Sequence, residues 1–192
     1  MSDKRVLVPL APGFEELEAV TIVNLLRRAG IDVVTAGLIP GLVTGARGMP
    51  IQPDATLDAV LAQLSGHPFD MIVLPGGMPG AEHLKNDARI QSLLQQMAAA
   101  GKYTAAICAA PIALAQAGLL DGRRATSYPG FIDTLAIPGC RCLTEAVVVD
   151  DHVVTSRGPG TAMDFALTLI ELLADRATRD RVEAGLVRAR PG

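Results

Sequence analysis

The chain has 192 residues, of which 49% are hydrophobic and 19% charged, a composition that favours a packed core over disorder. Its net charge of −3 gives no electrostatic reason to expect nucleic acid or an anionic membrane as a partner. Three cysteines are too few for a disulfide framework, and their odd number fits the reducing environment of the cytoplasm.

Neither of the two apolar stretches that resemble a targeting or membrane segment fits that role. Val6–Leu10 is too short for a signal peptide, contains Pro9 and runs into acidic residues. Tyr103–Ala115 is interrupted by Pro111 and is shorter than the roughly 20 residues that a membrane-spanning helix needs. We therefore expect a soluble protein.

Short apolar runs alternate with helical patterns along the chain, which predicts a parallel sheet flanked by helices. The first predicted elements are a strand at Val6–Leu10, a helix from Ala19 to Leu26 that ends at Gly30, a strand at Asp32–Gly37, and a hairpin or excursion in the Gly- and Pro-rich segment Leu38–Pro53. The middle of the chain is predicted to form a helix at Leu57–Leu64, a strand at Met71–Leu74, a helix at Ile90–Ala100, a strand at Tyr103–Ile107 and a helix at Ala109–Ala117. The last predicted elements are a hairpin of Ala146–Asp150 and His152–Ser156, a long helix from Ala162 to Leu173, and a helix at about Arg179–Val187. No repeat or linker divides the chain, so residues 1–192 are expected to form one domain.

Three loops of this predicted sheet carry groups that could take part in a reaction. In open parallel sheets, ligands bind in the crevice outside the carboxyl ends of the strands. The first strand is followed by an acidic segment that contains Glu18, the third by Gly76 and Gly77, and the fourth directly by Cys108. The sequence therefore predicts a carboxylate, a glycine turn with free N–H groups and a thiol in one crevice.

Cys108 lies where a strand passes directly into a helix. Such a tight junction is typical of a nucleophile elbow, and the small neighbours of Cys108 permit the close turn. Pro111 is tolerated in the first helical turn. The start of a helix favours thiolate over thiol and can bring a cysteine pKa down from about 8.5 to roughly 3.5–7.5. The alternative is that Cys108 is a small buried hydrophobic residue.

Glu18 and the glycine turn could each have either a chemical role or a purely structural one. A carboxylate beside a thiolate repels it, so one of the two groups should hold a proton, and a neutral Glu18 could donate a hydrogen bond to the sulfur or to an oxidised form of it. Otherwise Glu18 is an ordinary acid in the first turn of a helix. The N–H groups of Gly76, Gly77 and Ala109 could stabilise an oxyanion, or the glycines could form a simple strand-end turn.

Other residues are weaker candidates. The segment from Ser156 to Thr161, which contains Gly158 and Pro159, resembles a phosphate loop but lacks the lysine and spacing of a Walker sequence, so we assign it a structural role near the site. Cys140 and Cys142, separated by one residue, could bind a metal or oxidise, but no further ligands accompany them.

The three histidines, His67, His83 and His152, are predicted to lie in loops. A Cys–His dyad would form only if the fold brought one of them to Cys108. His152 is the one expected nearest to the crevice side of the sheet.

The chain resembles the ThiJ/PfpI superfamily, in the branch of the parkinsonism-associated protein deglycase and the YajL-like bacterial proteins. The resemblance extends over almost the whole chain. Its blocks are Leu10–Glu18 (LAPGFEELE), Arg27–Ile31 (RRAGI), Pro53–Leu57 (PDATL), Val73–Gly77 (VLPGG), Ala105–Pro111 (AAICAAP) and Thr155–Phe165 (TSRGPGTAMDF).

The resemblance implies a flavodoxin-like three-layer α/β sandwich with a nucleophile elbow, and a homodimer. It implies that Cys108 is the nucleophile, that Glu18 is the protonated acid beside it, and that Gly77 and Ala109 carry the nearest amides. Arg28 and Arg47 match positions that line an anion-friendly pocket near the dimer interface.

The implied activities need no cofactor or metal. They are glyoxalase-like conversion of methylglyoxal to lactate, protein deglycation and protection against oxidative stress, so the expected partners are a small aldehyde or a glycated substrate and a second copy of the chain.

The chain departs from family patterns near the site. Tyr128 occupies a position where one family member carries a histidine, and a phenol with a pKa near 10 is a poor base at neutral pH. Ala109 stands where the PfpI-type proteases have histidine, and the late His-x-Glu pair of glutamine amidotransferases is absent. Two hypotheses stay open, a glyoxalase or deglycase enzyme and a redox sensor or chaperone in which Cys108 is oxidised to sulfinate.

Overall fold

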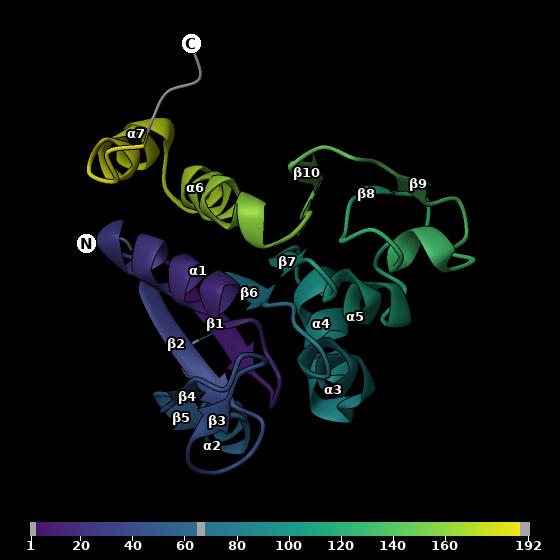
Figure 1. The fold of residues 1–192 in the computed structure, drawn as a ribbon, viewed down its shortest axis with the longest axis horizontal. Helices are drawn as coiled ribbons and strands as arrows, with labels where there is room; N and C mark the ends of the chain where they lie inside the picture. Colours follow the sequence, from purple (N-terminus) through teal and green to yellow (C-terminus); the bar gives the residue numbers. More distant parts are fainter. Residues whose placement is uncertain (1–2, 65–67, 189–192) are drawn as a thin grey trace.

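The computed structural model describes residues 3–64 and 68–188 (Figure 1). The strands are β1 (Arg5–Leu10), β2 (Asp32–Gly37), β3 (Val43–Thr44), β4 (Pro50–Ile51), β5 (Ala55–Thr56), β6 (Met71–Leu74), β7 (Tyr103–Ile107), β8 (Arg124–Ala125), β9 (Arg141–Cys142), β10 (Val147–Asp150) and β11 (Val153–Ser156). The helices are α1 (Glu16–Arg28), α2 (Leu57–Ala62), α3 (Gly80–Asn86), α4 (Ala88–Ala99), α5 (Pro111–Gln116), α6 (Ala162–Leu173) and α7 (Arg176–Ala184). Two short 3₁₀ turns cover Ile132–Thr134 and Pro159–Thr161.

Seven strands form one sheet in the order β10-β11-β7-β6-β1-β2-β5. All neighbouring pairs in it are parallel except β10 with β11. The strand order changes direction at β1, so right-handed crossovers place α1 on one face and α2 and α4 on the other. The crevice where ligands bind in such sheets therefore lies between the ends of β1 and β6.

The core lies on both faces of the central strands. Every residue of β6 is buried, as a strand covered on both faces requires. On one face α1 packs against α6, and α7 lies against α6 in turn (Figure 1). The apolar stripe predicted for α6 is confirmed, because Phe165, Leu169 and Ile170 are fully buried.

Most predicted elements are confirmed, with two kinds of difference. The helix after Cys108 begins at Pro111 instead of Ala109, because residues 108–110 are used by the turn. The last helix begins earlier than predicted, at Arg176, where the Asp175 side chain accepts a hydrogen bond from the N–H of Thr178 (2.7 Å). Helix α3 and the two-residue strands β5, β8 and β9 were not predicted. Among the described residues, no helix is both long and apolar enough to span a bilayer.

Candidate active site

Cys108 occupies the predicted elbow between β7 and α5. Its φ of 61° lies in the left-handed region, which non-glycine residues rarely adopt and which costs about 1–3 kcal/mol. Two distant segments hold this backbone: the Cys108 N–H donates to the carbonyl oxygen of Ser156 (3.0 Å), and the Cys108 carbonyl accepts from the N–H of Tyr128 (2.9 Å). The predicted tight turn between strand and helix at Cys108 is therefore confirmed, and only 9% of the surface of the residue is exposed.

Glu18 reaches the same place from α1. The residue has no exposed surface, and its Oε2 atom accepts a hydrogen bond from the N–H of Gly76 (2.8 Å). Its Oε1 atom is buried and has no hydrogen-bond partner of good geometry among the described residues. The Cys108 thiol interacts with this carboxyl group, so the acid and the sulfur form a pair.

Gly76 and Gly77 let the third loop approach that pair. A methyl group on Gly76 would lie 2.6 Å from the Cβ atom of Cys108 and 2.8 Å from Oε2 of Glu18, so no side chain fits there. Gly77 has a φ of 87°, and a Cβ atom on it would collide with the backbone of Gly13 and Glu15. The predicted convergence of the three loops is confirmed.

The electrostatics of the pair are governed by burial. Burial raises the pKa of Glu18 to about 7, against the opposing effects of the Gly76 N–H and the Cys108 thiol. Burial, followed by the charge of ionised Glu18, raises the pKa of Cys108 to about 12, although the N–H groups of Ala109 and Gly77 both donate to the sulfur. The expected helix terminus does not supply this stabilisation, because α5 starts only at Pro111.

Because Glu18 and Cys108 share one buried place, ionisation of either group opposes ionisation of the other, so the pair carries at most one negative charge at neutral pH. A thiolate at Cys108 receives two backbone N–H groups and a carboxylic O–H, whereas a carboxylate at Glu18 receives one N–H and a weak S–H donor. The balance of donors favours the charge on sulfur and the proton on Glu18.

Tyr128, Gly158 and Pro159 lie on segments that border this pair. The Tyr128 backbone bonds to Cys108, and its half-exposed ring lies against Gly158, where an added methyl group would be 3.2 Å from the ring. The N–H of Gly158 donates to Oγ1 of Thr161 (3.1 Å), and Pro159 begins the 3₁₀ turn before α6.

Arg28 and Arg47 do not join the Cys108 pair. Arg28 is ten residues beyond Glu18 on α1, about 15 Å along the helix axis, where it lines a cavity of about 550 Å³ that does not include Cys108. Its Nε atom donates to Oδ1 of Asn24 (2.8 Å). Arg47 lies between β3 and β4, and its backbone N–H donates to Oε1 of Glu16 (2.7 Å).

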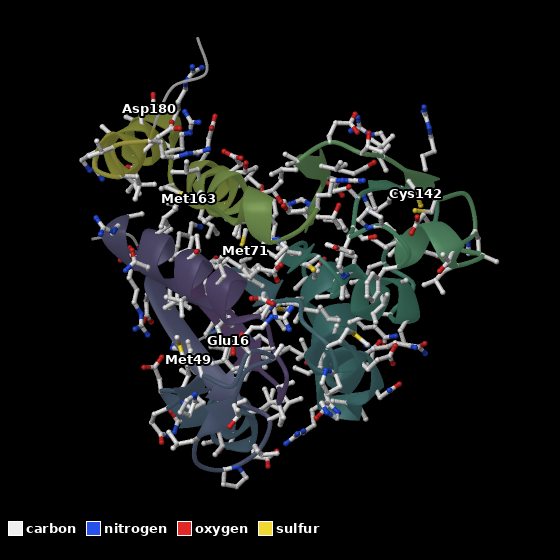
Figure 2. All side chains as sticks on the ribbon, in the orientation of Figure 1. Glu16, Met49, Met71, Cys142, Met163 and Asp180 are labelled. Carbon is white, nitrogen blue, oxygen red and sulfur yellow. The ribbon has the colours of Figure 1, made fainter. Side chains whose placement is uncertain are left out.

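Glu16 is the residue near the site that the sequence reasoning missed. It is buried and also accepts the backbone N–H of Met49 (3.2 Å), so it attaches the β3–β4 hairpin to the start of α1 (Figure 2). These backbone hydrogen bonds counter the effect of burial and lower the pKa of Glu16. Glu16 is one of several acidic residues in this segment, so the sequence does not single it out and only the fold shows its contacts.

The expectation that His152 lies on the crevice side is wrong. His152 precedes β11, so it lies at the amino end of that strand, whereas Cys108 follows the carboxyl end of β7. Its Nδ1 atom is 2.8 Å from Oδ1 of Asp151. His83 lies in α3 instead of a loop, and His67 is outside the described residues.

Comparison with known proteins agrees with this geometry. Residues 4–172 match the model of the DJ-1/PfpI family. The chain belongs to that family. Protein DJ-1 homolog A of Arabidopsis thaliana is 41% identical over 98% of the chain, but the chain spans only 48% of that relative, about half of its length.

Two DJ-1/PfpI relatives match the chain over nearly their whole length. Protein dj-1beta of Drosophila melanogaster is 41% identical over 96% of the chain and 97% of the relative. Its crystal structure superimposes with a TM-score of 0.90 at 40% identity, covering 99% of this chain and all of that one, which confirms the flavodoxin-like fold. A Caenorhabditis elegans protein named glutathione-independent glyoxalase DJR-1.2 is 36% identical over 90% of both chains.

Proposed function

We propose that the protein is a cofactor-free glyoxalase that uses Cys108 to convert α-oxoaldehydes such as methylglyoxal, or their adducts with proteins, into hydroxy acids without glutathione. The contact between Cys108 and the buried carboxyl group of Glu18 is the observation that carries this proposal. An acid whose pKa lies near 7 can both give and take a proton at neutral pH. The relative named as a glutathione-independent glyoxalase supports the same chemistry.

The first step is addition of the sulfur to the aldehyde. The Cys108 thiolate attacks the aldehyde carbon, a carbon–sulfur bond forms, and the oxygen takes the proton of Glu18 to give a hemithioacetal. The N–H groups of Gly77 and Ala109, which donate to the sulfur, lie next to the position where the oxygen becomes negative.

The second step moves hydrogen between neighbouring carbons. The Glu18 carboxylate removes the proton from the sulfur-bearing carbon and returns it to the adjacent carbon of the resulting enediolate. The hydroxyl proton of the sulfur-bearing carbon passes to the oxygen of the adjacent carbon, which leaves a 2-hydroxy thioester. Water then hydrolyses the thioester, releasing the hydroxy acid and free Cys108. One water molecule is consumed overall, and no electron acceptor is needed.

Replacing the nucleophile tests this proposal. We expect the Cys108→Ser variant to lose roughly a hundredfold or more of its lactate formation from methylglyoxal in glutathione-free buffer, because a serine hydroxyl is a far weaker nucleophile than a thiolate. Cys142→Ser makes the same change at an exposed cysteine outside the site and should keep wild-type turnover. Undiminished turnover in Cys108→Ser would exclude the mechanism.

A specific observation also favours a redox sensor. Oε1 of Glu18 is buried without a partner beside Cys108, and a protonated Glu18 could donate from it to an oxygen added to the sulfur. If mild peroxide adds two oxygens to Cys108 while methylglyoxal is not turned over by the reduced protein, the sensor role replaces the enzymatic one.

A further inference from the structure

Cys140 and Cys142 form a pair of thiols apart from Cys108. Cys142 belongs to the short strand β9 at the edge of the molecule, far from Glu16 on α1 (Figure 2). One residue separates the two cysteines; Cys142 belongs to β9, whereas Cys140 ends the turn before it, with its N–H donating to the carbonyl of Ile137 (3.2 Å). Neither cysteine is in a disulfide, and the Cys142 thiol lies near enough to raise the pKa of the Cys140 thiol.

The two sulfurs differ in their surroundings. Cys142 is exposed, whereas Cys140 is partly buried against the core. Backbone hydrogen bonds hold the neighbouring residues, because the N–H of Arg141 donates to the carbonyl of Arg123 and the N–H of Leu143 donates to that of Ala125, both at 2.8 Å. A reagent can therefore reach Cys142 directly, whereas Cys140 is less accessible.

The surroundings of Cys140 also affect how readily its thiol loses a proton. Burial, together with the nearby Cys142 and Asp121, raises the pKa of Cys140 to about 11, so its proton stays in place at neutral pH. A metal site is not supported, because no group of three or more His, Cys, Asp or Glu side chains comes together in the part of the chain that the structure describes.

We propose that Cys140 and Cys142 are a second redox site, which exchanges two electrons with small-molecule disulfides independently of Cys108. The Cys142 thiolate attacks a disulfide RSSR, forming a mixed disulfide and releasing one thiolate RS⁻. Cys140 gives its proton to that thiolate and attacks the Cys142 sulfur, so that an internal disulfide forms and the second RS⁻ leaves, taking the proton that Cys142 lost. One RSSR is reduced to two RSH while two protein thiols are oxidised.

The spacing makes this disulfide reversible. In a fully extended segment, residues two apart have Cα atoms at most about 6.6 Å apart, near the upper end of the roughly 4.4–6.8 Å range of disulfides, and the loop that such a bond closes contains a single residue. Closing the bond therefore strains the backbone, and strained disulfides are reduced more easily. Because β9 has only two residues, few backbone groups have to move when the disulfide closes.

Arg141 gives the test its readout, because trypsin cleaves after it and so separates the two cysteines. We expect oxidised glutathione, added to the Cys108→Ser variant, to lower the intact mass by two hydrogens. The tryptic peptide that ends at Arg141 should stay linked to the one that begins at Cys142 until dithiothreitol is added. The internal disulfide should exceed the mixed disulfide about tenfold or more, since the second step is intramolecular.

Removing the inner thiol is the matched control. In a Cys108→Ser, Cys140→Ser protein the mixed disulfide at Cys142 should accumulate, and Cys140→Ala should behave in the same way. Three results in the Cys108→Ser protein would overturn the proposal: no reaction, a stable mixed disulfide at Cys142, or a covalent dimer through Cys142. None of these results depends on the activity proposed for Cys108.

Discussion

Glu18 and Cys108 compete for one proton in a place that is closed to most of the solvent. The backbone donors around them are unequal, with two N–H groups directed to the sulfur and one to the carboxylate. A neutral Glu18 adds a third donor to the sulfur, so its value to the site lies in the proton that it keeps. The carboxyl group of Glu18, rather than the helix that follows Cys108, is therefore the partner that governs the proton of the thiol.

Substitution of Glu18 by glutamine tests whether the negative charge of the pair resides on Cys108 or on Glu18. Glutamine keeps a donor toward the sulfur but a weaker one, so the pH midpoint of Cys108 alkylation by iodoacetamide should rise by about one unit. A fall of several units would show instead that the wild-type charge resides on Glu18. Glu82→Gln, at a partly exposed glutamate of α3 that pairs with Lys85, should leave the midpoint unchanged.

At the scale of elements, the site depends on how closely the loop after β6 approaches the elbow after β7. Both strands could be predicted from the sequence, because they are short apolar runs that end in Gly-Gly and in Cys108. The meeting of their ends follows from the rule for parallel sheets. Helix α3 could not be predicted in this way, since His83, Lys85 and Asn86 interrupt its apolar pattern.

Other features depend on tertiary structure alone. The closing of the hairpin onto Glu16 joins residues about thirty positions apart, and no local pattern marks it. The direction of the pKa shift at Cys108 also depends on burial, which a strand-to-helix junction does not reveal. The position of His152 depends on the hairpin as well, because β11 runs antiparallel to β10 and parallel to β7, which places His152 at the end of the sheet opposite to Cys108.

Gly76→Ala tests the contact between these elements. The added methyl group would overlap both Cys108 and Glu18, so we expect a loss of about 1–3 kcal/mol in the free energy of unfolding and a change in the alkylation rate of Cys108. Gly160→Ala is the matched control, because its methyl group would meet no atom within 4 Å. Equal stability of the two variants in urea denaturation would contradict the close approach described here.

For the molecule as a whole, the exposed apolar surface on α1 is the feature that needs explanation. Leu17 and Val20 are each about half exposed, at 52% and 48%, and Met49 of the neighbouring hairpin loop is 56% exposed. Val20 also lines the cavity that Arg28 lines. We propose that a second copy of the chain covers this surface, in a homodimer.

Sedimentation velocity checks the dimer. The wild-type protein should sediment at twice its chain mass of 20.0 kDa, and Leu17→Glu should shift it to the monomer because a charge would be buried in the interface. Leu135→Glu changes a similarly exposed leucine elsewhere and should leave the dimer intact. A wild-type protein that stays monomeric at micromolar concentration would refute the assignment.

The backbone partners of the elbow have a consequence for the newly synthesised chain. Cys108 is held by Tyr128 and by Ser156, and Ser156 ends β11. A growing polypeptide that has not yet extended past Ser156 therefore carries an ordinary cysteine at this position. The left-handed turn at Cys108 therefore gains its full set of backbone partners only after β11 has been synthesised and has docked beside β7.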